Sequence, residues 1–129
     1  MTPRIIVIDD DADTVDCLRI ALKRRGYEVV GALSGAEGLA TIRAIRPGLI
    51  IIDVMMPDID GLDVCRSVRA DPALAGVAIV LLSARSALAD QAAGFEAGAN
   101  RYIVKPVSLG ALIKAVDELL ALDVMVPNP

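Results

Sequence analysis

The sequence has 129 residues, of which 55% are hydrophobic and 23% are charged, so it is long enough for one domain with a sizeable core. It contains no histidine, which excludes Ser-His-Asp and Cys-His catalysis, zinc sites with histidine ligands and a role as a phosphohistidine carrier. Aromatic residues make up only 2%, which argues against stacking platforms for single-stranded nucleic acid. The net charge of −4 argues in the same direction, so we expect no direct nucleic-acid binding by this domain.

The two cysteines, Cys17 and Cys65, are far apart and form neither a CxxC motif nor a set with metal-ligand spacing. We expect both to be small buried hydrophobic residues in a reducing compartment. The longest apolar runs, such as residues 48–52, are too short to span a bilayer, and we expect no signal peptide ahead of the first strand. These features together predict a cytoplasmic protein that does not bind membranes.

Short apolar segments alternate along the chain with segments of helical periodicity. Continuous apolar runs rich in β-branched residues predict strands that are buried on both faces of a parallel sheet. Five such strands are predicted, at residues 4–8, 27–32, 49–52, 78–82 and 102–104.

Apolar residues at helical spacing predict a helix after each strand. The first helix is expected to end at the basic run 23–25, because cations favour the negative end of the helix dipole, and Gly26 follows as a stop signal. The second is expected to start after Ser34 and end before Pro47, and the last to start after Ser108. The positions that define the five helices are Val15, Leu18 and Leu22; Ala36, Leu39 and Ala40; Leu62, Cys65 and Val68 (or Arg69); Leu88, Ala92 and Phe95, ahead of Gly98; and Leu109, Leu112, Ile113, Val116, Leu119 and Leu120.

Five strands alternating with five helices predict a doubly wound α/β domain with a five-stranded parallel sheet. Right-handed crossovers bring the carboxyl ends of all strands to one edge of the sheet, where such folds bind ligands. We expect residues 1–122 to form this domain. Residues 123–129 lose the helical pattern and are expected to form a tail or the start of a linker.

The predicted strands are followed by acids, a hydroxyl and an ammonium group. Asp9 and Asp10 follow the first strand, Asp53 the third, Ser83 the fourth and Lys105 the fifth. Carboxylates about 4 Å apart repel each other by roughly 4 kcal/mol at an effective dielectric constant near 20, so such a cluster must share protons or bind a cation. Oxygen ligands without nitrogen or sulfur favour Mg²⁺ or another hard ion. With an ammonium group and a hydroxyl to bind an anion, the set predicts a phosphoryl-transfer site with a carboxylate nucleophile.

Structural roles compete for the acids in this region. Residues 9–11 also suit a helix cap, and we assign that role to Asp11 or Asp13, which we leave out of the site. Asp58 and Asp60 are interpreted as turn residues, because aspartate hydrogen-bonds readily to nearby backbone.

These residues resemble the receiver domain of bacterial two-component response regulators. The resemblance covers residues 4–120 and is carried by motifs at the predicted strand ends: Asp9-Asp10; Asp53 followed by Met-Pro, Asp60 and Gly61; Ser83-Ala84; and Tyr102-Ile103-Val104-Lys105-Pro106. It implies a flavodoxin-like (βα)5 fold with strand order 2-1-3-4-5. It also implies that the Lys105–Pro106 peptide bond is cis.

The resemblance further implies a role for each acid and for the lysine. Asp53 is the expected phospho-acceptor. Asp10 is the expected direct Mg²⁺ ligand, together with Asp53 and the backbone carbonyl of Met55, while Asp9 is expected to act through metal-bound water. Lys105 is expected to pair with the Asp53 carboxylate and then with the phosphoryl group.

Two further positions are implied to be the switch. The hydroxyl of Ser83 is expected to move to the phosphoryl oxygen, and Tyr102 to turn inward as it moves; an inert strand-end hydroxyl and a half-buried filler are the alternatives. Met55 and Arg85, two positions after Asp53 and Ser83, depart from the family pattern at places that tune the phosphoryl lifetime, which the sequence leaves open. The side chains of Met55 and Met56 are expected to pack rather than to bind metal through sulfur.

The implied function is that of a signalling switch, not an enzyme, whose only reactions are self-phosphorylation and autodephosphorylation. It takes the phosphoryl group from a sensor histidine kinase or a phosphotransfer protein. Phosphorylation changes the surface of the fourth helix, fifth strand and fifth helix, which controls a downstream effector domain or protein and offers a face for a homodimer. The 129 residues hold no predicted effector domain after the receiver, so we expect either a stand-alone receiver or a fragment of a longer regulator.

Two other functions share part of this pattern. An unphosphorylated pseudo-receiver, acting as an interaction module, would have the same fold, but the complete set of acids, hydroxyl and lysine argues against it. A haloacid-dehalogenase-like phosphatase uses the same aspartyl-phosphate chemistry, and Asp9-x-Asp11 formally fits its DxD motif. With 129 residues, the chain has no room for the capping insertion of such a phosphatase.

Overall fold

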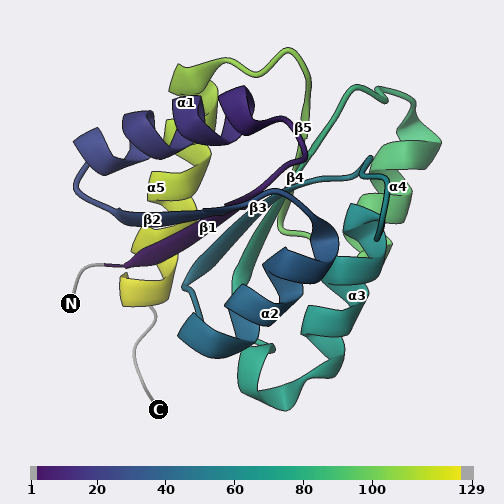
Figure 1. Ribbon diagram of the computed structural model, residues 1–129, viewed down its shortest axis with the longest axis horizontal. Helices are drawn as coiled ribbons and strands as arrows, with labels where there is room; N and C mark the ends of the chain where they lie inside the picture. The colour runs from purple at the N-terminus through teal and green to yellow at the C-terminus, as the bar shows by residue number, and fades with distance from the viewer. Residues whose placement is uncertain (1–2, 126–129) are drawn as a thin grey trace.

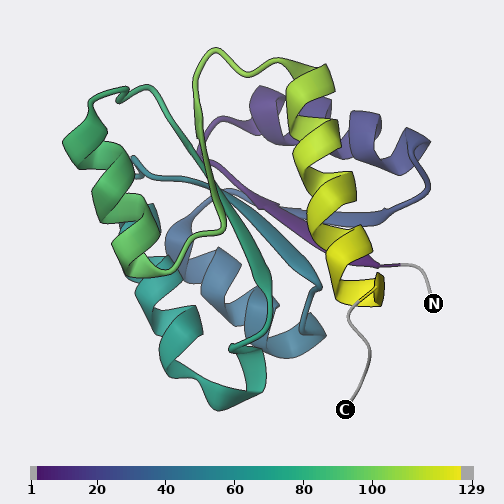
Figure 2. The same cartoon turned by 180° about the vertical axis from the view of Figure 1, so that it is seen from behind.

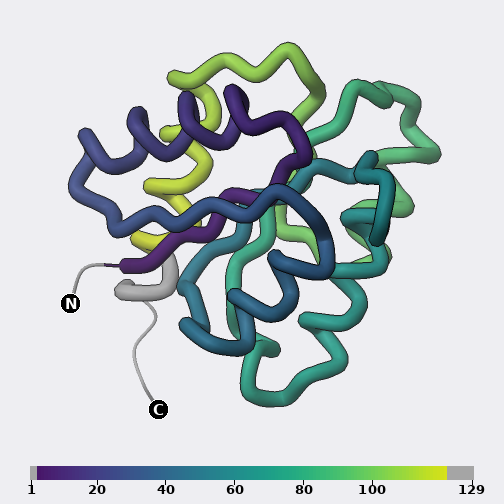
Figure 3. The backbone as a smooth tube through the Cα atoms, in the orientation of Figure 1, coloured from purple at the N-terminus to yellow at the C-terminus, as the bar shows by residue number. Residues whose placement is uncertain are grey.

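The computed structural model describes residues 3–125, in which five parallel strands alternate with five α-helices (Figure 1). The strands form one sheet in the order β2-β1-β3-β4-β5, and Figure 3 traces the chain through this alternation. The predicted doubly wound fold and its strand order are confirmed. The strands are β1 (Arg4–Ile8), β2 (Glu28–Ala32), β3 (Leu49–Asp53), β4 (Ala78–Ser83) and β5 (Arg101–Val104).

Helices cover both faces of the sheet, as the two opposite views show (Figure 1, Figure 2). On one face lie α1 (Ala12–Arg24) and α5 (Leu109–Met125). On the other lie α2 (Gly35–Ile45), α3 (Gly61–Ala70) and α4 (Leu88–Ala97), with a short 3-10 turn, η1 (Pro72–Leu74), after α3. Each face has its own hydrophobic cluster, which explains why the central strands are apolar on both sides.

Side-chain caps mark the starts of α1, α2 and α5. Asp11 is the N-cap of α1: its carboxylate accepts hydrogen bonds from Asp13 N (3.1 Å) and Thr14 Oγ1 (2.8 Å), and these bonds lower the pKa of Asp11. Ser34 caps α2 in the same way, and the hydroxyl of Ser108 accepts from Ala111 N at the start of α5. These caps confirm the starts that the sequence predicts.

The last helix is longer than its apolar pattern. It continues to Met125, past the expected end of the pattern at Leu122, and residues 126–129 of the expected tail lie outside the described residues. The boundary of the domain at residue 122 stays a prediction. No helix within residues 3–125 is long and apolar enough to cross a membrane.

Two expectations about burial were wrong, those for Cys17 and Met55, and α4 buries a different face from the one that its larger apolar residues mark. Leu88 and Phe95, whose spacing indicates α4, are 83% and 49% exposed, while Gly94 and Ala97 face the sheet. Small residues pack there because the helix lies close to the strands, so the apolar stripe points outward. Cys17 is exposed on α1, unlike the buried Cys65. The side chain of Met55, expected to pack, is 51% exposed; that of Met56 does pack against the core.

Candidate functional site

Three carboxylates meet at the carboxyl edge of the sheet. β1 and β3 are neighbours, with Ile8 paired to Ile52, so the next residue of each strand, Asp9 and Asp53, lies at the same edge. Oxygen atoms of Asp9, Asp10 and Asp53 all lie within 4.8 Å of one another. Asp9 and Asp53 are buried, at 1% and 7% exposure, whereas Asp10 is exposed. The cluster therefore has two fixed, desolvated acids and one that faces solvent.

The ammonium group of Lys105 joins the two buried acids. Its Nζ lies 2.9 Å from Asp53 Oδ2 and 3.1 Å from Asp9 Oδ2. Burial lowers the pKa of Lys105, but the hydrogen bonds to the two carboxylates outweigh burial and hold the pKa above its usual value. Lys105 is thus a fixed positive charge between two negative ones.

Backbone amides hold the remaining oxygens of these acids. Asp11 N donates to Asp9 Oδ1 (3.0 Å), and Met55 N donates to Asp53 Oδ1 (3.1 Å). Each buried carboxylate therefore has one oxygen on the ammonium group and the other on an N–H of the loop that follows its own strand. Two directional bonds fix the orientation of each carboxylate.

The two residues predicted to be the switch both bind the backbone of Arg85. Ser83 is fully buried, and its Oγ accepts from Arg85 N (3.1 Å). The hydroxyl of Tyr102, from the neighbouring strand β5, donates to Arg85 O (2.9 Å). One peptide segment at the start of the β4–α4 connection thus links the buried hydroxyl to the aromatic ring.

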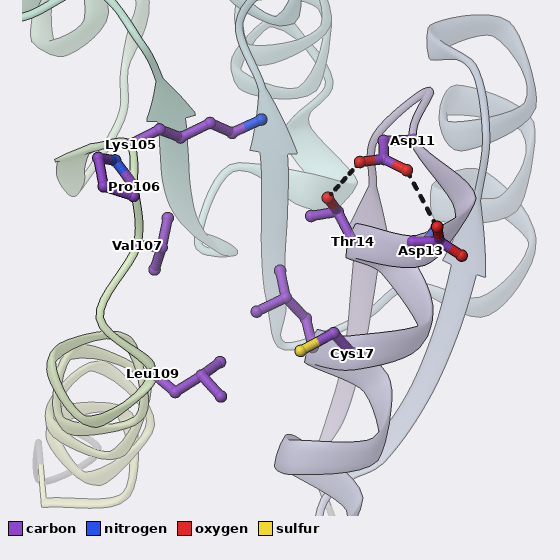
Figure 4. Close-up of a pocket in the computed structure, with 9 residues that line it drawn as sticks. Asp11, Asp13, Thr14, Cys17, Lys105, Pro106, Val107 and Leu109 are labelled. Carbon is purple, nitrogen blue, oxygen red and sulfur yellow. Dashed lines mark hydrogen bonds between the residues drawn. The ribbon is translucent and has the colours of Figure 1, made fainter.

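The site opens to solvent on two sides. A groove of about 610 Å³ runs between α1 and the β5–α5 connection (Figure 4), and its lining includes Thr14, Cys17 and Lys105. A second hollow, of about 400 Å³, is lined by the loop after β3 and by Arg85. Another molecule can therefore approach the lysine from one side, while the loop that carries Met55 borders the other.

Comparisons with known proteins decide the family. The sequence matches the family described as response regulator receiver domain over residues 5–117. The chain belongs to this family. Curated relatives include the DNA-binding response regulator MtrA of Mycobacterium tuberculosis, 40% identical over 116 residues, and its transcriptional regulatory protein PrrA, 42% identical over 119 residues. These alignments cover 90% and 92% of this chain but 50% of each relative, so the chain spans about half the length of the curated relatives it matches.

Solved receiver structures share the fold. The chemotaxis response regulator CheY4 of Vibrio cholerae superposes with a TM-score of 0.87 at 27% identity, covering 92% of this chain and 99% of that one. A CheY-like receiver domain protein from Methanospirillum hungatei gives 0.88 at 29% identity, covering 94% and 95%. The chain is thus a receiver domain of a two-component response regulator, a class of signalling switches that receive their signal from histidine kinases.

The acidic cluster of this receiver domain fits the ion expected there. Receiver domains bind Mg²⁺ at an acidic pocket, and Asp9, Asp10 and Asp53 supply hard oxygen donors within reach of one ion. Asp10 stands outside the pairing with Lys105, which leaves its carboxylate open to a metal. The direct role of Asp10 and Met55, and the water-mediated role of Asp9, stay predictions.

The structure thus brings together Asp9, Asp10, Asp53 and Lys105, as the sequence predicts, and the Lys105–Pro106 bond is cis. Ser83 is the fifth residue of the predicted site, and it lies at the end of β4, the strand next to β3.

One residue interpreted as part of a turn has a further contact. The carboxylate of Asp58 accepts from the backbone of Gly35 and Ala36 in α2. Asp60, by contrast, caps its own helix by accepting from Leu62 N (2.6 Å). Sequence spacing carries no signal for the first contact, because its partners lie more than twenty residues away.

Proposed function

We propose that this receiver domain accepts a phosphoryl group on Asp53 from the phosphohistidine of a sensor kinase or a phosphotransfer protein. The observation that carries the proposal is the ammonium group of Lys105, held by Asp53 and Asp9 beside the three-carboxylate cluster. A hard cation, a fixed ammonium group and an oriented carboxylate are what an in-line attack on phosphorus requires.

The transfer forms one bond to phosphorus and breaks another. An oxygen of Asp53 forms the new P–O bond, the P–N bond to the donor histidine breaks, and the imidazole leaves with the electron pair. Asp10, Asp53 and the Met55 carbonyl would hold the Mg²⁺ ion directly, and Asp9 would bind it through a water molecule. The ion would supply positive charge that neutralises the phosphoryl oxygens. Lys105 lies on Asp53 before the transfer, and so it is positioned to pass to the phosphoryl oxygens after it.

The new charge then acts on the switch. Phosphoryl oxygens carry roughly −1.5 to −2 charges, which draws hydrogen-bond donors toward them. If the Ser83 hydroxyl turns to the phosphoryl group, its contact with Arg85 N is altered, and Arg85 O holds Tyr102. The change spreads along α4, β5 and α5, and this surface meets the effector or a second copy of the domain.

The output is a second part of the proposal. MtrA is named as a DNA-binding response regulator and PrrA as a transcriptional regulatory protein, and this chain matches half of each. We propose that the domain acts in the cytoplasm, controls an effector domain or protein, and has no direct contact with nucleic acid. Its net charge of −4 supports the absence of direct binding to nucleic acid, which is itself negatively charged. Its chemistry is restricted to its own phosphorylation and dephosphorylation.

Intact-mass spectrometry after incubation with acetyl phosphate and Mg²⁺ tests the acceptor. The wild-type chain is expected to gain one phosphoryl group, and Asp53→Asn none. Asp60→Asn is the matched control, because Asp60 is an exposed acid that caps α3, and it is expected to behave like the wild type. Equal gain in Asp53→Asn would overturn the assignment.

Hydrogen exchange tests the surface. Exchange with and without beryllofluoride, which mimics a bound phosphoryl group, is expected to change over residues 83–110 and along α5. Changes confined to α1 and α2, with residues 83–110 silent, would contradict the proposed route.

A further inference from the structure

The loop between β3 and α3 is fixed at its base. Gly61 N donates to Val54 O (2.9 Å), so the chain leaves the phospho-acceptor strand and returns to it within one closed loop. Met55 begins this loop, with its amide on Asp53. The orientation of the Met55 carbonyl therefore depends on the path of the residues between these two ends.

The tip of the same loop is fixed to a different helix. Asp58 uses both carboxylate oxygens: Oδ1 accepts from Gly35 N (3.1 Å) and Oδ2 from Ala36 N (2.9 Å). The next donor of α2, Glu37 N, is already taken by its own cap, the Ser34 hydroxyl. Asp58 thus satisfies amides that the helix cannot satisfy itself, and its negative charge suits the helix N-terminus.

The contact leaves no room for a side chain at position 35, the first residue of α2. A β-carbon at Gly35 would lie 2.8 Å from Ile59 Cβ and 2.9 Å from Ile59 O. The backbone of the loop therefore lies directly against the first turn of α2. Ile59 itself packs against the core cluster on this face, so the tip of the loop is held on both sides.

The hydrogen bonds also keep Asp58 ionised. Donation by Ala36 and Gly35 lowers the pKa of Asp58 below its usual value, because the bonds favour the charged form. Asp58 is exposed, so this network and not burial fixes its position.

We propose that Asp58 is a positioning residue for the metal site. It holds the tip of the loop on α2, and this fixes the segment that carries the Met55 carbonyl in place before the ion arrives. The inference rests on the proposed function, since it assumes that Mg²⁺ binds beside Met55. It also connects α2 to the phosphorylation loop by two hydrogen bonds, so α2 is not mechanically isolated from the site.

A purely structural role makes a different prediction. If Asp58 only capped α2, its removal would lower the stability of the fold and leave the affinity of the folded protein for Mg²⁺ unchanged. If Asp58 positions the loop, affinity falls even at temperatures where the variant is fully folded, because ordering the loop then opposes binding.

Isothermal titration calorimetry with Mg²⁺ alone distinguishes the structural role of Asp58 from the positioning role. It is done on the full chain, well below the unfolding temperature. Asp58→Ala is expected to weaken Mg²⁺ binding by about 3- to 10-fold. Asp58→Asn loses the same charge but keeps one acceptor, and its loss is expected to be smaller. Gly35→Ala disturbs the same contact from the helix side with Asp58 intact, and it is expected to weaken binding as well.

Asp13→Asn is the charge control. Asp13 is an exposed acid in the first turn of α1 that lines the same groove as Lys105, and its hydrogen bond is to Asp11 and not to the loop. Its removal is expected to change the affinity for Mg²⁺ by less than about twofold. If Asp58→Ala does not fold, Asp58→Asn and Gly35→Ala carry the test. Wild-type affinity in the folded loop variants, or an equal loss in Asp13→Asn, would overturn the inference alone. A wild-type chain that binds no Mg²⁺ would overturn the proposed metal site and the inference together.

Discussion

The ring of Tyr102 lies where a β-carbon on Gly94 would need to be. Such an atom would stand 2.8 Å from Tyr102 Cδ2 and 3.0 Å from Leu81 Cδ1. The ring is therefore packed directly on the backbone of α4, while its hydroxyl holds Arg85 O at the start of the connection to the same helix. Tyr102 thus touches α4 near its end and binds the segment that leads into it.

Gly94→Ala tests this packing. The added methyl group is expected to push the ring away, weaken the bond to Arg85 O and lower the free energy of unfolding by about 1–3 kcal/mol. Urea denaturation measures the loss, and NMR shifts of the Tyr102 ring report its displacement. Gly110→Ala is the matched control: the new β-carbon meets only Ser108 Oγ, at 3.8 Å, so it is expected to stabilise α5 by about 0.5–1 kcal/mol. An unchanged ring in Gly94→Ala would contradict the packing argument.

Asp10 is predicted to lower the stability of the metal-free protein slightly and to be required for Mg²⁺ binding. It repels Asp9 and Asp53 but takes no share of Lys105, so Asp10→Ala without metal is expected to be as stable as the wild type, or more stable by about 0.5 kcal/mol. With Mg²⁺ the order reverses, because only the wild type gains stability from the ion. Thermal melts with and without Mg²⁺ measure both effects. Equal stabilisation of Asp10→Ala by Mg²⁺ would place the metal elsewhere.

Arg69 joins α3 to the other end of the sheet from the acids. Its guanidinium donates to Gly98 O (2.8 Å), Ala75 O (2.9 Å), Val77 O (2.6 Å) and Asn100 Oδ1 (2.9 Å). Arg69→Met keeps the apolar stem and removes all donors, which is expected to lower the free energy of unfolding by about 2–3 kcal/mol.

Urea denaturation measures this loss, and exchange of the last α4 amides is expected to speed up with it. Arg66→Met is the control on the same helix, because Arg66 is exposed and, within the part of the chain that the structure describes, forms an ion pair with Asp63 alone. Its cost is expected to be below about 0.5 kcal/mol. Equal costs for both arginines would show that the four acceptors of Arg69 contribute nothing.

The hydroxyl of Tyr27 makes the free energy of unfolding depend on pH in the alkaline range. Its hydroxyl donates to Asp117 on α5, which Arg25 also binds (2.5 Å), and burial together with that carboxylate raises the pKa of Tyr27 to about 12. Since the unfolded value is 10.0, the folded protein holds the phenolic proton more tightly. This stabilisation is complete below pH 10 and is lost as the pH rises toward 12.

Tyr27→Phe is therefore expected to be less stable than the wild type by about 1 kcal/mol at neutral pH, with the difference shrinking above pH 10. Urea denaturation of both proteins across this range measures it. Taking the difference removes the contribution of Lys105, whose raised pKa also costs stability at high pH. A constant difference from pH 8 to 12 would contradict the role of the proton.

The sequence predicts the strand ends well because a parallel sheet leaves little choice. A run such as residues 49–52 is buried on both faces, and the first acid after it must stand at the carboxyl edge. The same reasoning, applied to the first and fifth strands, places Asp9 and Lys105 at that edge, and the resemblance to receiver domains adds the expected pairing of Lys105 with Asp53, which the structure shows.

Other features depend on distances that the sequence does not contain. The apolar stripe of α4 faces solvent because Gly94 lets the helix approach the sheet, and periodicity alone assigns the larger residues to the core. Asp58 has the composition of a turn residue, and its second role exists only because the loop folds back on α2. Cys17 lies next to the buried stripe of α1, but it is exposed and lines the groove beside that helix.

The exposure of Cys17 makes the unmodified chain suitable for site-specific labelling. Its only other thiol, Cys65, is 1% exposed, donates to Ala97 O, and has a pKa raised by burial, all of which slow its reaction with electrophiles. A maleimide reagent should therefore attach at one position without any mutation. That position lines the groove that leads to Lys105 (Figure 4), so a spin label or fluorophore there would report on any molecule that enters it.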